Sequence, residues 1–285
     1  MIISTFSIVA RDPETGALAV AGNSNGFCYG RWVPHLKSGA GALATQGAVN
    51  LWYAKQGLED LDKGLSAQET LDDLLKQDPD TKGMSQVLFL DREGNTAVHT
   101  GKRCYGYAAD ISKKNLAIAG NTLANEDVVA AMESFYESSD EPFALKLIKT
   151  LQAGEEAGGD IRGKKSAALK IVTGTSNEKG EDVLYDIRVD KNNAPLQELE
   201  KLYYTAEAYK LIDDAWATEN DMEALLFFQQ ALVLDPGNPE IMFWIARKNL
   251  ALGNTEEANH LKKQLFAMKG NWEEYWRRFD ARERS

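Results

Sequence analysis

Apolar residues alternate with polar or small ones at the start of the chain, which is the pattern of a β-strand. In Thr5–Ala10 the Phe, Ile and Ala side chains fall on every second position. Asp12–Gly16 has the residues of a tight turn, because proline fixes one φ angle and glycine accepts a left-handed one. Ala17–Ser24 is small and apolar. We therefore predict a β-hairpin whose second arm lies within a sheet.

Between residues 39 and 121 the pattern predicts mostly strands, interrupted by one helix. The small-residue stretch Gly39–Gly47 is a strand that neighbours can approach closely on both faces. The helix begins at Ser66, which stands three positions before Glu69 in the arrangement of a capping box, and it ends at Asp78–Asp80. A second hairpin and another buried strand complete this part: Gln86–Leu90, Asn95–Thr100 and Leu116–Asn121.

Two helices and two more strands follow. Apolar residues keep helical spacing over Val128–Tyr136, after Asn125 as a candidate N-cap. A second helix covers Phe143–Leu151 and is predicted to end at Ala153–Gly154. Helices grouped between antiparallel strands are typical of an α+β domain built from stacked layers. The last two predicted strands are Ala167–Val172 and Leu184–Val189.

After Pro195 the strand patterns cease, and the sequence becomes helical with an internal period of 34 residues. Identical residues recur at this spacing in five pairs: Ala217 with Ala251, Asn220 with Asn254, Glu223 with Glu257, Ala224 with Ala258, and Gln230 with Gln264. The turn Leu234–Pro239 separates the two units. This period resembles that of tetratricopeptide repeats, two of them, at about 204–237 and 238–271.

The change of pattern divides the chain into an α+β domain, residues 1–193, and an all-helical domain, residues 196–285. In the last predicted helix the aromatic stripe Trp272–Phe279 is either a packed cap on the repeats or a docking face for a partner. Two repeats are few for an independent array. Aromatic side chains on short helices need covering, so we expect a homo-oligomer. The residues concerned are Trp216, Phe243, Trp244, Trp272 and Trp276.

The composition disfavours several classes of function. Of the 285 residues, 44% are hydrophobic and 26% charged, as in a soluble globular protein. The net charge of −11 makes nucleic acid and anionic membranes poor partners, and no apolar run has the length of a membrane span. Cys28 and Cys104 have no metal-binding or redox spacing, and the histidines are scattered. We expect no metal, no cofactor and, because Met1–Ile3 is too short for a signal peptide, a cytoplasmic location.

One residue of the first hairpin offers candidate chemistry. Thr5 opens the first strand, and a hydroxyl residue in that place is the layout of an N-terminal nucleophile hydrolase, in which a Thr, Ser or Cys attacks and its own α-amine accepts the proton. The alternative is an ordinary strand residue, because β-branched side chains favour strands. A free amine on Thr5 requires that the peptide bond Ser4–Thr5 be cut.

Several stretches together resemble an uncharacterised bacterial and archaeal family that is assigned to the N-terminal nucleophile hydrolase superfamily. They are Thr5–Asp12, Ala44–Gln46 with Val49–Asn50, Gly120–Asn121, and Gly158–Gly163 with Ser166–Leu169. The resemblance covers roughly residues 5–190 and implies a four-layer αββα sandwich with Thr5 as the nucleophile. It implies no substrate. It places six further residues near the same cleft: Ser24, Gln46, Asn121, Asp160, Arg162 and Ser166.

The chain departs from that family's pattern just after the second strand. A lysine commonly follows the serine there and could tune the pKa of the nucleophile, whereas this sequence has Asn25. Lys37 is a candidate substitute.

The glycine-rich stretch Gly158–Ser166 is a second place with candidate chemistry. Its glycines let the backbone turn sharply and approach another group. Asp160 and Arg162 are two positions apart, so they share a side in an extended segment. Arg162 could then bind a carboxylate of a substrate through two hydrogen bonds. The alternative is that Asp160 and Arg162 pair with each other or cap a strand.

Three classes of function remain open. The first is an amide hydrolase that acts on a small molecule or short peptide through Thr5, with the oxyanion held by backbone N–H groups or by Asn121. The second is an inactive binding protein on the same fold, whose repeats recruit a protein partner. The third is a structural protein in which both domains mediate oligomer contacts. Cleavage of Ser4–Thr5 separates the first class from the other two.

Overall fold

The computed structural model describes residues 1–177 and 180–283, and the chain divides into two compact units. The first unit is Met1–Leu202 and the second is Tyr203–Ser285, so the division falls inside the helix α6 (Pro195–Ala217). Residues 178–179 of the first predicted domain and residues 284–285 of the second lie outside the described residues. Each unit is described by itself below.

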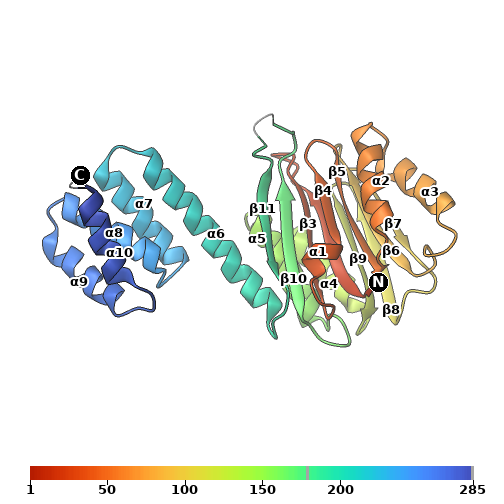
Figure 1. Cartoon of the computed structure of the whole chain (residues 1–285). Helices are drawn as coiled ribbons and strands as arrows, with labels where there is room; N and C mark the ends of the chain where they lie inside the picture. Colours follow the sequence, from red (N-terminus) through yellow and green to blue (C-terminus); the bar gives the residue numbers. More distant parts are fainter. Residues whose placement is uncertain (178–179, 284–285) are drawn as a thin grey trace. The chain divides into compact units, whose positions relative to one another are not determined.

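The described residues of the first unit form two antiparallel sheets (Figure 1). One sheet has the order β1-β5-β6-β7, with β4 also paired to β5, and the other has the order β11-β10-β3-β2-β9-β8. The strands are β1 (Ile2–Ile3), β2 (Thr5–Arg11), β3 (Leu18–Ser24), β4 (Pro34–Lys37), β5 (Gly41–Ala48), β6 (Ser85–Asp91), β7 (Thr96–Thr100), β8 (Tyr107–Lys113), β9 (Leu116–Leu123), β10 (Ser166–Val172) and β11 (Val183–Val189).

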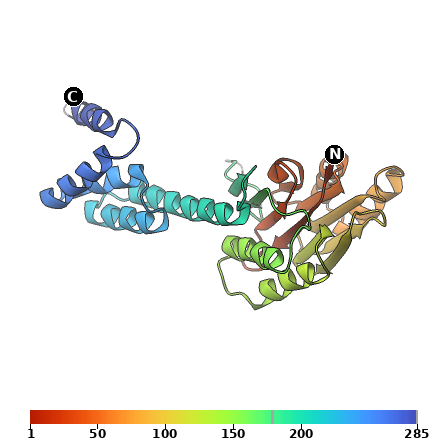
Figure 2. The ribbon, with the colours of Figure 1, turned by 90° about the horizontal axis from the view of Figure 1, so that it is seen from below.

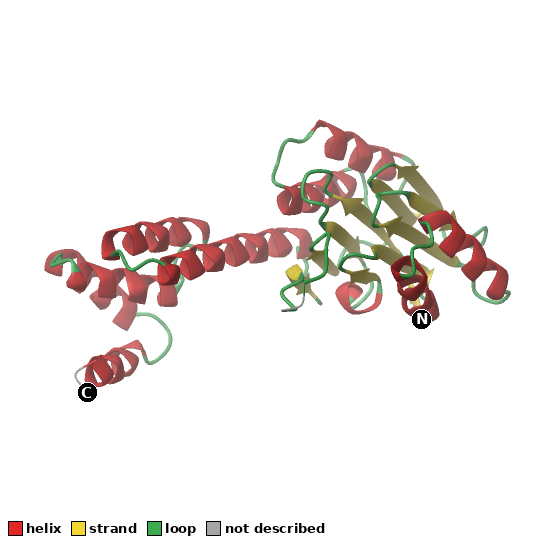
Figure 3. Cartoon of the chain, turned by 90° about the horizontal axis from the view of Figure 1, so that it is seen from above, coloured by secondary structure: helices red, strands yellow, loops and turns green. Residues whose placement is uncertain are grey.

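Helices cover the outer faces of these sheets. One pair, α2 and α3, packs on β5, β6 and β7, and another pair, α4 and α5, packs on β2, β3, β9 and β10. Figures 2 and 3 show the two pairs on opposite sides of the strands. The sheets face each other directly, because β2, β3 and β9 contact β5 and β6. The helices of the first unit are α1 (Tyr29–Trp32), α2 (Leu51–Asp62), α3 (Ala67–Gln77), α4 (Asp127–Ser138) and α5 (Phe143–Glu156).

Local sequence signals act where they were predicted in the first unit. Gly16 has φ +77° in the turn between β2 and β3, and its N–H donates to the carbonyl of Asp12. The capping box is formed: the Ser66 hydroxyl accepts from the N–H of Glu69, and the Glu69 carboxylate accepts from the N–H of Ser66. The N-cap of α4 is Glu126, one position after the predicted Asn125, and Asn125 nevertheless accepts from the N–H of Asp127. Turns and helix caps can therefore be predicted from a few neighbouring residues.

Two helix predictions were wrong. A second helix, α2, lies between β5 and α3 where strands with a single helix were expected. The helix α5 continues through Ala153 and Gly154 to Glu156 instead of ending there. Gly154 serves close packing, because a Cβ on it would stand 2.7 Å from Cγ of Met132 on α4. A glycine that lets two helices approach has the same sequence signature as one that ends a helix.

The described residues of the second unit form helices joined by short loops, and the helices pack around aromatic side chains. Its helices after α6 are α7 (Asp221–Leu234), α8 (Pro239–Ala251), α9 (Thr255–Phe266) and α10 (Trp272–Glu283). Residues paired by the period occupy matching places, since Ala224 and Ala258 are both buried near the start of a helix. Of the aromatic residues that were expected to need covering, Phe243 and Trp276 are buried within the unit, whereas Trp216 is half exposed.

Candidate active site

A row of hydroxyl side chains crosses three neighbouring strands at one end of the sheet that contains β2. In the register of that sheet Ser166 lies opposite Ser24, and Ser24 lies opposite Thr5. All three residues are fully buried. They meet because β2 and β10 begin at this end of the sheet and β3 ends there. Residues far apart in the sequence are thus placed side by side by antiparallel pairing.

Thr5 is the first residue of β2 and has no exposed surface in the intact chain. Its hydroxyl donates to the carbonyl oxygen of Asn23 on the neighbouring strand, at 2.5 Å. Burial of a hydroxyl is favourable when it has such an acceptor. The two preceding residues, Ile3 and Ser4, are 3% exposed each, so the chain directly before Thr5 is itself buried.

The carbonyl of Ser4, which belongs to the peptide bond that precedes Thr5, receives two hydrogen bonds. The hydroxyl of Ser24 donates to it at 2.6 Å, and Nη2 of Arg162 donates to it at 3.2 Å. The Ser24 oxygen is itself fixed, since it accepts from the N–H of Gly26 at 2.8 Å. A hydroxyl and a guanidinium on one carbonyl oxygen withdraw electrons from its carbon and stabilise negative charge on the oxygen.

Asp160 holds Arg162 in this position. Its carboxylate accepts from Nε at 2.9 Å and from Nη2 at 2.6 Å, and it also accepts the N–H of Arg162 at 3.0 Å. The side chain of Asp160 is fully buried, whereas that of Arg162 is 43% exposed. The hydrogen bonds to Asp160 raise the pKa of Arg162, so the guanidinium stays charged. The pairing that was the alternative reading of these residues is therefore present, and it directs Arg162 toward Ser4.

The loop that carries Asp160 and Arg162 depends on glycine. Gly158, Gly159 and Gly163 have φ angles of +129°, +58° and +94°, which side chains rarely adopt. An isolated bridge joins Asp160 to Leu123 at the end of β9. The loop is thereby attached to the sheet at the end where Thr5 begins its strand. We use the name carbonyl cluster for Ser24, Asp160 and Arg162.

Gln46 and Asn121 lie in a different group of buried polar side chains. Gln46 accepts from the hydroxyl of Ser7 and donates from Nε2 to Oε1 of Gln86 at 2.8 Å. Asn121 also donates to Oε1 of Gln86, at 3.0 Å. The hydroxyls of Ser7 and Tyr29 are 2.9 Å apart, and burial raises the pKa of Tyr29, so its phenol stays neutral. This inter-sheet network consists of Ser7, Tyr29, Gln46, Gln86 and Asn121.

Ser166 positions backbone at the edge of the site. Its hydroxyl donates to the carbonyl of Gly26 at 2.7 Å and accepts from the N–H of Tyr29 at 3.1 Å. These bonds fix the segment after β3, which carries Gly26 and thus supports Ser24. The predicted residues therefore separate into groups. Ser24, Asp160 and Arg162 surround one carbonyl, Gln46 and Asn121 join the inter-sheet network, and Ser166 braces the loop.

Sequence reasoning missed two residues here. Gln86, the centre of the inter-sheet network, was predicted only as the start of a strand, and a polar side chain next to the apolar run of β6 was the available signal. Lys165 places its Nζ 3.5 Å from Oδ1 of Asn25, so a lysine does stand beside the position that follows Ser24. Lys37, the candidate substitute, instead pairs with Asp62 at 2.6 Å on the outside of the unit.

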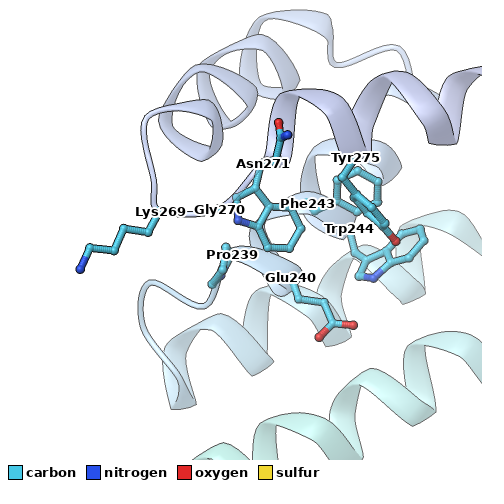
Figure 4. A pocket seen from close by; sticks show the side chains of 9 residues that line it. Pro239, Glu240, Phe243, Trp244, Lys269, Gly270, Asn271 and Tyr275 are labelled. Carbon is cyan, nitrogen blue, oxygen red and sulfur yellow. The ribbon is translucent and has the colours of Figure 1, made fainter.

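The second unit has a groove lined by aromatic side chains (Figure 4). Its volume is about 410 Å³, and it lies between the start of α8 and the start of α10. Phe243, Trp244 and Tyr275 line it together with Glu240 and Lys269. Tyr275 is 46% exposed there.

The described residues contain no helix long and apolar enough to cross a membrane. They also contain no group of three or more His, Cys, Asp or Glu side chains arranged to hold a metal ion.

Comparison with known proteins gives a family and no activity. A solved protein of Silicibacter pomeroyi, assigned to the same family model as this chain, is 29% identical with a TM-score of 0.65, over 71% of this chain and 89% of that one. Anbu (ancestral beta-subunit) from Yersinia bercovieri is 12% identical over 70% and 92% of the two chains, and its TM-score of 0.32 is too low to carry an argument. No curated protein matches significantly. The model described as "Family of unknown function (DUF1028)" matches residues 5–199, so the chain belongs to that family.

Proposed function

We propose that the protein is an amide hydrolase of the N-terminal nucleophile type, with Thr5 as the nucleophile. One observation carries the proposal: the carbonyl of Ser4, joined directly to Thr5, receives hydrogen bonds from Ser24 and from the charged Arg162. Two donors of this kind on the carbonyl beside a hydroxyl residue match the needs of acyl transfer, in which that oxygen becomes negatively charged. An ordinary strand threonine would need no such arrangement.

The first reaction is cleavage of the chain's own Ser4–Thr5 bond. Oγ1 of Thr5 attacks the carbonyl carbon of Ser4, and the oxyanion is stabilised by Ser24 and Arg162. The C–N bond breaks, the Thr5 nitrogen takes the hydroxyl proton, and the acyl group is left as an ester on Oγ1. Water then hydrolyses the ester, which releases the Ser4 carboxylate and leaves Thr5 with a free amine and a free hydroxyl.

The mature site then acts on other amides by the same route. The neutral α-amine of Thr5 accepts the hydroxyl proton and later protonates the leaving amine, and water resolves the ester. An α-amine has a pKa of about 8 in the absence of perturbation, so activity rises as the pH increases toward that value. This chemistry needs no metal or cofactor. Small amides and short peptides are the proposed substrates.

We further infer that the two sheets and their helices are the four-layer αββα sandwich of the N-terminal nucleophile superfamily. Support comes from the face-to-face sheets, from the helices on their outer faces, and from a nucleophile candidate at the start of a central strand. We place the protein in the reducing cytoplasm, because Cys28 and Cys104 are both free thiols.

The test is a hydrolysis screen of small N-acyl amides and short peptide amides. It uses protein whose terminus has been confirmed as Thr5, with Thr5→Ala trimmed to the same terminus as the control. The proposal expects turnover that disappears in Thr5→Ala and persists in Thr5→Ser. Equal turnover by wild type and Thr5→Ala would remove Thr5 from the mechanism.

A second candidate function is protein binding through the helical unit, whose helix pairs we interpret as tetratricopeptide-like. The observation that favours it is a set of exposed apolar side chains, among them Trp216 at 51% and Val233 at 77% exposure. Such a surface is usually covered by a partner, and we propose a second copy of this chain. Light scattering should then give a mass of at least twice 31.5 kDa, and the monomer mass at micromolar concentration would contradict it.

A further inference from the structure

The segment Met1–Ser4 is bound as an extended strand. Ile2 lies opposite Ala48 and Ile3 opposite Gly47, which pairs β1 with the end of β5. The carbonyl of Met1 accepts from the N–H of Val49 at 2.9 Å. On the edge of β5 that pairs with β1, β4 pairs only with residues 41–44. The other edge of β5 pairs with β6. Without β1, residues 47–49, at and just after the end of β5, would have no strand on this edge.

The side chains of this segment alternate between solvent and the interior. Ile2 is 51% exposed, whereas Ile3 is 3% exposed and belongs to the apolar cluster between the sheets. Gly26 borders the site of Ile3, because a Cβ on Gly26 would stand 3.2 Å from Cγ2 of Ile3. Ile3, two residues before the scissile bond, therefore fills a buried apolar site, which we call the seat of Ile3. Ile2, three residues before that bond, has no such site.

The segment ends at the carbonyl cluster, where Ser24 and Arg162 donate to the carbonyl of Ser4. The protein thus holds the acyl side of one amide bond by three independent means. These are the free edge of β5, the apolar seat of Ile3, and two donors on the reacting carbonyl. Cleavage at Ser4–Thr5 would free all of them together, next to the nucleophile that it creates.

We propose that the processed protein binds the acyl part of its substrate as an extended strand in the place of β1. Adding a strand to a free sheet edge is a common mode of peptide recognition. The substrate class is then a peptidyl amide with a small residue at the scissile carbonyl and a branched apolar residue before it. This inference rests on the proposed function, whose active site it fills.

The direct test compares acetyl-Ile-Ile-Ser with acetyl-Ile-Gly-Ser as free acids, by calorimetry on protein that begins at Thr5. The acetyl carbonyl takes the place of the Met1 carbonyl. Such protein comes from its own cleavage or, failing that, from trimming at a protease site placed before Thr5. Acetyl-Ile-Ile-Ser should bind about 10- to 100-fold more tightly than acetyl-Ile-Gly-Ser, since an apolar side chain that fills a pocket changes the affinity by that order. Acetyl-Gly-Ile-Ser should bind like the first peptide, and equal binding by all three would overturn the proposal.

A substitution at the site that holds Ile3 supplies a control for the peptide comparison. Gly26→Ala adds a methyl group toward the place of Ile3 and, at 3.0 Å, toward Oγ of Ser24. The second contact weakens both peptides alike, so the ratio of their affinities is the informative quantity. This ratio should fall several-fold toward one in Gly26→Ala. An unchanged ratio would place the peptide elsewhere.

The intact chain gives a second measurement that needs no trimming. Ile3→Gly should slow cleavage of the Ser4–Thr5 bond about 10-fold or more, because the segment loses its buried side chain. Ile2→Gly is the matched control, with a half-exposed side chain, and should cleave at nearly the rate of wild type. Equal slowing by both variants would contradict a seat for Ile3. If wild type never cleaves and no amide is turned over, the proposed function fails, and the binding ratio still decides the docking proposal.

Discussion

Two groups of largely buried polar side chains lie at the same end of the first unit, and they differ in which atoms accept their hydrogen bonds. In the inter-sheet network the donors are spread over several acceptors: Gln46 and Asn121 share Oε1 of Gln86, and Gln86 itself donates to backbone carbonyls such as that of Gly120. In the carbonyl cluster two donors end on the backbone oxygen of Ser4, beside a hydroxyl residue. The difference teaches that burial and polarity alone do not mark a reactive site. Convergence of donors on one carbonyl is what favours the carbonyl cluster as the proposed site, because such donors lower the cost of charge on that oxygen.

The largest effect expected from this comparison is that of Thr5. Thr5→Ala should abolish cleavage at residue 4 and all turnover, a loss of about 10³-fold or more, because a nucleophile and its base act as a unit. Ser7→Ala is the matched control, since Ser7 lies on the same strand and is equally buried but belongs to the inter-sheet network. N-terminal sequencing of both variants gives the answer. Cleavage lost equally in both would show that the two groups do not differ in function.

Arg162 should come next. Arg162→Ala should slow cleavage about 10²-fold, the usual cost of removing one donor from a developing oxyanion, and Arg162→Lys should recover part of it. Lys164→Ala is the control, because Lys164 is in the same loop and pairs with Glu155 at 3.2 Å instead. The rate is read from intact mass over time after refolding. A normal rate in Arg162→Ala would leave Ser24 alone on the carbonyl.

A change in the inter-sheet network should act on stability. Gln86→Ala removes the acceptor that Gln46 and Asn121 share, and a buried donor that loses its acceptor costs about 1–3 kcal/mol. The free energy of unfolding in urea should fall by about that amount or somewhat more, while the rate of Ser4–Thr5 cleavage stays within a few-fold of wild type. A fall in cleavage as large as in Arg162→Ala would join the two groups into one site.

Asp78 offers the smallest effect and a dependence on pH. Burial alone would raise its pKa, but hydrogen bonds from Thr81, Tyr53 and Asp80 outweigh burial and lower the pKa to about 2. The ionised form is therefore favoured by folding. Its contribution is complete above pH about 4, where an unfolded aspartate is ionised, and it is lost as the pH falls toward 2. The contribution is on the order of 2 kcal/mol.

The matching variant for Asp78 is Asp78→Asn. Urea unfolding should show it less stable than wild type at pH 7, with the difference shrinking as the pH is lowered from about 4 to 2. A difference that stays constant over this range would mean that the charge of Asp78 is not what the hydrogen bonds stabilise. Cleavage of Ser4–Thr5 should be unaffected, because Asp78 lies after α3 and bonds to Tyr53 and Thr81.

The sequence predicted most elements of the first unit because their signals are local. The Asp12–Gly16 turn and the Ser66 capping box depend on residues within a few positions. The glycine within α5 misled the prediction, because its role depends on Met132 of another helix. Local patterns fix turns and caps, and tertiary contacts decide the ambiguous glycines.

The candidate site could be predicted only in part. The glycine-rich loop made Asp160 and Arg162 visible, and the first strand made Thr5 visible. The Ser4 carbonyl, which joins these residues into one site, could not be predicted. It is a backbone group, and Arg162 is 158 positions away in the sequence. The role of Gln86 was missed for the same reason, since its hydrogen-bond partners come from other strands.

The measurement that tests the central claim most directly is N-terminal sequencing of the purified wild-type protein, together with its intact mass followed over time. The account predicts that the terminus becomes Thr5, with the mass falling by that of the segment before it, and that Arg162→Ala delays this change. A chain that keeps residues 1–4 or 2–4 through prolonged incubation, in wild type as in Thr5→Ala, would contradict the claim.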